Sequence, residues 1–154
     1  MKKKILIILS ILLLLAGFAA AGIAYAQMNA PKHPSDYHIG IKYNEAVKSD
    51  KPILAVFYVD WCGYCLKFMP KFNILSRIYK DKYNFVMINV EEPENKKLSE
   101  DVGIGGYPTV YILDPKYDNR VLMPNTAYQN LAKFRIELDR YLRIRRLLDK
   151  ASKN

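Results

Sequence analysis

The spacing and placement of two cysteines constrain this chain more than any other feature. They are its whole complement of cysteine, in the segment Trp61-Cys62-Gly63-Tyr64-Cys65, after an apolar run over residues 53–59 and before a helical pattern. This order predicts a dithiol or disulfide pair at a strand-to-helix junction. At the first turn of a helix, unpaired N–H groups and the positive end of the helix dipole favour a thiolate. We therefore expect Cys62 to be the nucleophile and Cys65, about one helical turn further on, to resolve a mixed disulfide.

The same cysteine spacing has two other interpretations. With His33 and His38, the two histidines of the chain, the cysteines would supply four zinc ligands. These histidines stand in a proline-rich N-terminal stretch, and structural zinc sites usually take their ligands from loops and hairpins rather than from a strand-to-helix junction such as the one that carries the cysteines. Two buried cysteines without chemistry are the other alternative, but it leaves the redox-type spacing unexplained. We assign neither a metal nor a cofactor to the chain.

The first 26 residues have the pattern of an export signal. Lysines at positions 2–4 precede an uncharged apolar segment, residues 5–26, which ends in small residues around Tyr25. Its short Ile/Leu core followed by Ala and Gly favours cleavage after Ala26. An uncleaved membrane anchor is the alternative, because about 20 apolar residues suffice to cross a bilayer. In both cases we expect the rest of the chain in the periplasm or another extracytoplasmic space.

After the signal, the sequence predicts a linker over residues 27–37 and a single domain over residues 38–150. The formal net charge is +9, and much of the excess lies in residues 133–153. Basic helices can bind nucleic acid or anionic membranes. Export argues against nucleic acid as a partner, and the mixed charges of residues 133–140 predict a solvated helix face.

The order of the expected elements is that of an α/β domain. Strands are expected over residues 53–59, 85–90, 109–113 and 120–123. Helices are expected over residues 66–80, with a kink at Pro70, over 95–102 and 126–150, and around 44–49. This order predicts a mixed sheet with helices on both faces.

Three widely separated motifs resemble the thioredoxin fold, over about residues 38–150. They are the Cys-x-x-Cys segment after a hydrophobic strand, Pro70 five residues past the second cysteine, and the Gly-rich segment 103–109 with Pro108 before a strand. A single Cys-x-x-Cys is a weak signal, whereas the three motifs together are specific. The resemblance implies a thioredoxin fold, with a mixed central sheet flanked by helices on both faces, and a thiol-disulfide oxidoreductase activity.

The resemblance also implies which residues position a substrate. In this family a proline like Pro108 forms a cis peptide bond and faces the cysteine pair. The bond would turn the backbone of Tyr107 and Thr109 outward, so that an extended substrate segment can pair with it like an added strand. The remaining residues of this substrate surface are Trp61, Gly63 and Tyr64.

Two further features resemble exported thioredoxin-like reductases, including the periplasmic C-terminal domain of the transmembrane disulfide reductase. They are Lys51-Pro52 at the start of the first strand and Asp60 at its end. This resemblance implies protein substrates with disulfides or thiols, and a membrane redox partner that recharges the dithiol. It favours a reductant over an oxidant or isomerase of the same fold. A non-catalytic carrier of copper or of an apoprotein is the alternative from another class, because a reduced cysteine pair suits Cu(I).

Three positions depart from cytosolic thioredoxin. Tyr64 replaces the proline between the cysteines, a change that tends to make members of the family more oxidising. Val56 stands where that family has a buried aspartate, and Met87 stands near its companion lysine. Because the aspartate-lysine pair helps to remove the proton of the resolving thiol, we expect Cys65 to depend on water or on a neighbour such as Asp60.

Overall fold

The computed structural model describes residues 2–152, in two compact units that divide after Lys32. The first unit is dominated by helix α1 (Lys2–Met28). Its stretch Lys3–Met28 has a mean hydropathy of 2.7, is exposed along its length, and is long enough to cross a membrane. These properties fit a signal sequence or an anchor. Short 3-10 helix η1 (Pro34–Tyr37) lies in the stretch assigned to the linker but belongs to the second unit.

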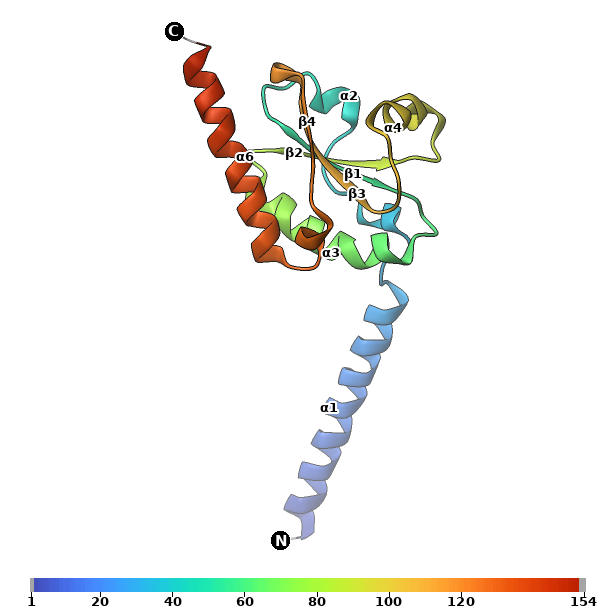
Figure 1. The fold of residues 1–154 in the computed structure, drawn as a ribbon. Coiled ribbons are helices and arrows are strands. Elements are labelled where there is room, and N and C mark those ends of the chain that lie inside the picture. Colours follow the sequence, from blue (N-terminus) through green and yellow to red (C-terminus); the bar gives the residue numbers. More distant parts are fainter. Residues whose placement is uncertain (1, 153–154) are drawn as a thin grey trace. The chain divides into compact units, whose positions relative to one another are not determined.

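The second unit is built on a four-stranded mixed sheet in the order β2-β1-β3-β4 (Figure 1). Strand β1 is parallel to β2 and antiparallel to β3, which pairs in turn with β4 in antiparallel register. The bounds are β1 Ile53–Tyr58, β2 Asn84–Asn89, β3 Thr109–Asp114 and β4 Asn119–Leu122. Each strand begins and ends within one residue of the positions predicted from the sequence.

The central strand β1 is buried on both faces, as its continuous apolar sequence predicts. Leu54, Val56 and Tyr58 pack into a cluster with residues of two helices on one face. Its alternate residues pack into a second cluster on the other face. The helices on the first face are α3 (Gly63–Tyr79) and α6 (Leu131–Ala151), and those on the second are α2 (Tyr43–Ala46) and α4 (Lys96–Val102) (Figure 1).

Helix α3 begins directly after the first cysteine and continues through Pro70. Because proline has no N–H, Pro70 leaves one backbone hydrogen bond of the helix unmade. Pro70 is exposed, so the helix tolerates the loss of this bond. The apolar residues expected to form one buried face do so, at spacings of three and four residues. They are Phe68, Phe72, Leu75 and Tyr79.

The prediction of a single helix over residues 126–150 is wrong. The structure has a short helix α5 (Asn125–Tyr128), a break, and then α6. Asn130 begins α6 as its N-cap, because its side-chain oxygen accepts hydrogen bonds from the N–H groups of Ala132 and Lys133, at 2.8 and 3.2 Å. Lys71 of α3 donates to the carbonyls of Tyr128 and Gln129, which holds the end of α5 beside α3.

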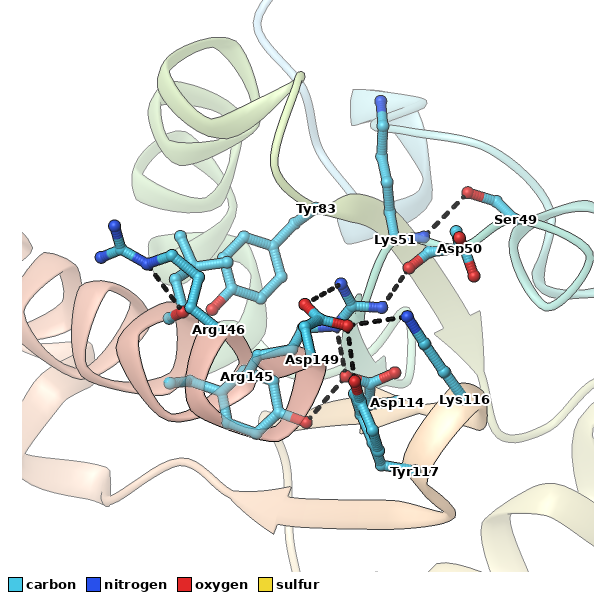
Figure 2. Close-up of polar contacts among 12 residues, drawn as sticks. Ser49, Asp50, Lys51, Tyr83, Asp114, Lys116, Tyr117, Arg145, Arg146 and Asp149 are labelled. Carbon is cyan, nitrogen blue, oxygen red and sulfur yellow. Dashed lines mark hydrogen bonds and ion pairs between the residues drawn. The ribbon is translucent and has the colours of Figure 1, made fainter. Parts of the chain in front are cut away.

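A cluster of polar contacts fastens α6 to the end of β3 (Figure 2). The carboxylate of Asp114 is buried, and its Oδ2 accepts hydrogen bonds from Arg145 Nε at 2.7 Å and from the Tyr141 hydroxyl at 3.0 Å. Arg145 also donates to the backbone carbonyl of Asp50, before β1. One turn further along α6, Asp149 accepts a 2.7 Å ion-pair hydrogen bond from Lys116. No local sequence pattern indicates these contacts, which join residues far apart in the chain.

The outer edge of β2 is partly covered by the segment that leads into α2. Ile41 donates a backbone hydrogen bond of 2.9 Å to the Phe85 carbonyl, and Ile39 donates one of 3.2 Å to the thioether sulfur of Met87. Gly40, between them, has a φ of +84°, and a Cβ atom there would lie 1.9 Å from the Phe85 carbonyl oxygen. Only glycine therefore fits at this position.

Candidate active site

The two cysteines are joined by a disulfide at the start of α3, with their Cα atoms 5.2 Å apart. Cys62 is the N-cap residue of the helix, and its sulfur accepts a hydrogen bond from the N–H of Cys65 at 3.0 Å. The two residues differ in access, since Cys62 is 7% exposed and Cys65 is 0% exposed. Cys62 thus retains a small exposed area, whereas Cys65 is enclosed.

The residues that pack beneath the cysteines are apolar. Cys62 and Cys65 belong to the same core cluster as Val56 of β1 and Val110 of β3, which face each other in the sheet. Val56 also pairs with Met87 of β2, so the positions of the thioredoxin aspartate and lysine are adjacent here and neither is charged. Over residues 2–152, the one buried charged residue is Asp114, at the end of β3 away from Pro108. Among the residues that the structure describes, none therefore places a buried carboxylate beneath the pair.

Trp61, directly before the cysteines, is 72% exposed but held from two sides. Its indole N–H donates to Glu91 Oε1 at 2.9 Å, and its ring meets that of Tyr107 edge-on, with centroids 6.1 Å apart. Asp60 accepts a 3.1 Å hydrogen bond from the N–H of Ser35, in η1. Asp60 and Trp61, directly before Cys62, are thus fixed by contacts to segments that are distant in the sequence.

The peptide bond between Tyr107 and Pro108 is cis, as the resemblance to thioredoxins implied. Thr109 follows as the first residue of β3, paired with Phe57 of β1, and its hydroxyl donates to the Gly106 carbonyl at 2.6 Å. Both chain segments that carry the expected site residues therefore meet at the same end of the sheet, where β1 leaves it and β3 enters it.

A groove of about 800 Å³ lies between α3 and the loop before β3. Four of the expected substrate-positioning residues, Tyr64, Tyr107, Pro108 and Thr109, line it together. Trp61 is not among the lining residues and reaches the groove through its ring contact with Tyr107. Gly63 also lies outside the lining, with open space where a Cβ would be. The groove is also lined by residues that were not expected in the site from the sequence, among them Lys67, Lys71 and Tyr128.

A face of α3 forms one wall of this groove. Tyr64, Lys67, Phe68 and Lys71 recur at spacings of three and four residues, so they lie on the same side of the helix. The sequence contains a signal for these residues, because they follow the expected site residue Tyr64 at helical spacing. Which side of the helix meets the loop at Pro108 could be known only from the fold.

Two tyrosines with altered acidity lie near the site. The hydroxyl of Tyr128 accepts a 2.8 Å hydrogen bond from the Val110 N–H, and burial raises its pKa to about 12. Burial raises the pKa of Tyr58 to about 12 as well, with a further contribution from the negative charges of Asp60 and Glu92. Both phenols therefore stay protonated at neutral pH, and neither serves as a base.

The sequence model of the family described as Thioredoxin matches residues 37–134. The chain belongs to the thioredoxin family. It is 36% identical over 74 residues to the thioredoxin-like protein HCF164, chloroplastic, of Arabidopsis thaliana, and the matched region covers 48% of this chain and 28% of that protein. It is 32% identical over 97 residues to the probable protein disulfide-isomerase A6 of Medicago sativa, and this match covers 60% of this chain and 26% of that protein. The chain thus spans about a quarter of the length of these relatives.

Solved structures agree with the thioredoxin fold. The germline-specific thioredoxin Deadhead of Drosophila melanogaster superposes with a TM-score of 0.51 at 27% identity, covering 71% of this chain and 97% of that one. The Trx4 domain of ERdj5 superposes with a TM-score of 0.53 at 21% identity, covering 65% and 88%. The fold class expected from the three sequence motifs is confirmed.

Proposed function

We propose that this chain is a thiol-disulfide oxidoreductase that exchanges its Cys62/Cys65 dithiol with disulfides of protein substrates. The observation that carries the proposal is the asymmetry of the pair. Cys62 lies at the N-terminus of α3, where the helix favours a thiolate, and is the more exposed of the two residues. Cys65 is fully buried within bonding distance of it. Family membership with an intact Cys-x-x-Cys pair supports the same activity.

The reaction runs as two successive exchanges. The Cys62 thiolate attacks one sulfur of a substrate disulfide, forms a mixed disulfide, and releases the other substrate sulfur as a thiolate. Cys65 loses its proton and attacks the Cys62 sulfur, which forms the intramolecular disulfide and releases the second substrate thiolate. Two electrons pass from protein to substrate, and a dithiol partner must return them.

Removal of the Cys65 proton is the step for which this site differs from cytosolic thioredoxin. With Val56 and Met87 beneath the pair, a buried base is not supplied by β1 or β2. Asp60, two residues before Cys62, is the acidic residue nearest to the pair in sequence, and it is partly buried and accepts a hydrogen bond from the Ser35 N–H. We assign proton transfer to water or to Asp60.

A reducing role is the direction we propose, on the resemblance to exported reductases. Tyr64 between the cysteines and the relatives named as protein disulfide-isomerases favour the alternative, an oxidant or isomerase. The reduction potentials of reductants and oxidants of this fold differ by small energies, since about 30 mV equals about 1.4 kcal/mol for a two-electron couple. Equilibration of the Cys62/Cys65 couple with glutathione buffers measures this potential and decides between the two directions. A potential well below that of glutathione supports the reductant, and one well above it supports the oxidant.

We further propose that the thioredoxin domain works outside the cytoplasm, next to a membrane redox partner that recharges it. The apolar helix α1 supports this placement, because it fits either an export signal or an anchor. Fractionation of cells and determination of the N-terminal residue test it. A chain that starts after Ala26 in the soluble extracytoplasmic fraction supports cleavage, whereas an intact chain in the membrane fraction supports anchoring.

Trapping of substrates tests the roles of the two cysteines. A Cys65→Ser variant should accumulate mixed disulfides through Cys62, because the resolving sulfur is absent. The matched Cys62→Ser variant should accumulate almost none, since its remaining thiol is buried. Equal trapping by both variants would overturn the assignment. Insulin reduction by the wild-type protein separates catalysis from a copper or apoprotein carrier, because a carrier would not turn over.

A further inference from the structure

The groove beside the cysteine pair carries charge of one sign. Lys67 and Lys71 line its α3 wall, and none of the described residues that line it is acidic. The rest of the lining consists mainly of aromatic side chains, exposed glycine backbone and amide side chains. An apolar groove with fixed positive charge favours an extended segment that combines apolar side chains with a carboxylate.

The two lysines have different partners. The ammonium group of Lys71 donates to the carbonyls of Tyr128 and Gln129, so part of its hydrogen-bonding capacity is used within the domain. Lys67 is exposed, and its ammonium lies over the ring of Tyr64, 5.8 Å from the centroid. No carboxylate among the described residues forms an ion pair with Lys67. Its charge is therefore available to a bound molecule.

The position of Lys67 sets where a substrate carboxylate would stand. Lys67 is five residues beyond Cys62 on α3, and at about 1.5 Å per residue this is about 7.5 Å along the helix axis. An extended chain rises about 3.3 Å per residue. A segment whose cysteine meets Cys62 and which runs along the groove thus brings a side chain about two residues away to Lys67.

We propose that Lys67 selects substrates in which an acidic residue stands about two positions from the reactive cysteine. This inference rests on the proposed oxidoreductase function and specifies the chemistry of its substrate. The carboxylate pairs with Lys67 during docking, while the substrate backbone lies against the loop at Pro108. Attack of Cys62 on the substrate sulfur and resolution by Cys65 then follow as described, with two thiols released for each disulfide consumed.

Two synthetic peptides test the selection. They differ only in the residue two positions from a single cysteine, aspartate in one and lysine in the other, and each is a mixed disulfide with uncharged 2-mercaptoethanol. The full chain in a nonionic detergent, reduced with dithiothreitol and then freed of it, reacts with each peptide in a stopped-flow instrument. The emission of Trp61, the single tryptophan, follows the reaction.

The wild-type protein should react with the acidic peptide on the order of five-fold faster, which is the scale of one partly exposed ion pair. Lys67→Gln should remove most of this preference, and Lys67→Glu should reverse it. Lys48→Glu makes the same change of net charge after α2, at the end of the sheet away from the cysteines, and should keep the preference. Added salt should weaken the wild-type preference.

Reduction of uncharged hydroxyethyl disulfide separates the two proposals. If the protein reduces this compound but does not distinguish the peptides, or if Lys48→Glu and Lys67→Glu change the preference equally, selection by Lys67 is wrong and the oxidoreductase function stands. If the protein reduces neither hydroxyethyl disulfide nor either peptide, the oxidoreductase function itself is wrong, and the selection falls with it.

Discussion

Replacement of Gly40 by alanine should destabilise the thioredoxin domain far more than the same change at Gly103. Both glycines have left-handed backbones, with φ of +84° and +71°. A side chain in that conformation costs about 1–2 kcal/mol. At Gly103 nothing lies within 4 Å of the new Cβ, so this is the whole cost. At Gly40 the Cβ would lie 1.9 Å from the Phe85 carbonyl oxygen, which no side-chain rotation relieves.

The segment around Gly40 must therefore move off β2. It then loses the Ile41 hydrogen bond to Phe85, worth about 0.5–1.5 kcal/mol, and the burial of Ile39, worth about 1.5–3 kcal/mol. With the backbone strain, the loss amounts to about 3–6 kcal/mol for Gly40→Ala against about 1–2 kcal/mol for Gly103→Ala.

Urea unfolding followed by far-ultraviolet circular dichroism measures both variants. With a slope of about 2 kcal/mol per molar, the midpoint should fall by about 1.5–3 M for Gly40→Ala and by at most about 1 M for Gly103→Ala. Equal shifts would refute the reasoning, because backbone conformation alone would then explain both. A Gly40→Ala protein that is unfolded without urea agrees with the upper end of the range.

Three further outcomes are expected. Arg145→Met should cost about 3–5 kcal/mol in unfolding free energy because it leaves the buried Asp114 carboxylate without its cation, whereas Arg146→Met, on the exposed side of α6, should change it by less than about 0.5 kcal/mol. The pKa of Asp149 is lowered from 3.8 to about 2, chiefly by the hydrogen bond from Lys116 and then by that from Tyr117. Its stabilisation is thus complete above about pH 4 and lost between pH 4 and 2, and urea midpoints of Asp149→Asn should fall less over that interval than those of the wild type. Val56→Asp should lower stability, because it places a carboxyl of raised pKa in an apolar strand, but should speed the resolving step near neutral pH in stopped-flow reduction of a small disulfide; an unchanged rate and pH profile would show that proton acceptance is not limiting.

The features of the fold that could be predicted were those with a local sequence signature. The continuous apolar run that became β1 predicted a strand buried on both faces, and Cys62 was expected where α3 begins. The Gly-rich segment before Pro108 likewise marked the turn into β3. In each case a few neighbouring residues determine the local conformation, so the sequence contains the information without knowledge of the rest of the fold.

The features that were missed depend on contacts between distant residues. The apolar spacing of the last helix continues across Asn130, so the break was hidden until the cap hydrogen bonds were seen. Asp114 looked like a turn residue, and nothing near it indicates that Arg145, 31 residues later, neutralises it in the core. The second wall of the groove beside α3 has the same origin, because it forms only when the loop at Pro108 comes to lie against α3.

The strip of chain over residues 39–41 also governs how the sheet ends. Beside β2 it forms a single N–H to carbonyl bond through Ile41, and the thioether of Met87 takes the place of a second carbonyl acceptor. Unpaired strand edges invite pairing with another polypeptide. With Gly40 turning the strip close against β2, this edge is occupied from within the same molecule. Loss of the strip would leave the edge of β2 open to pairing with another chain, so protection of this edge depends on a residue without a side chain.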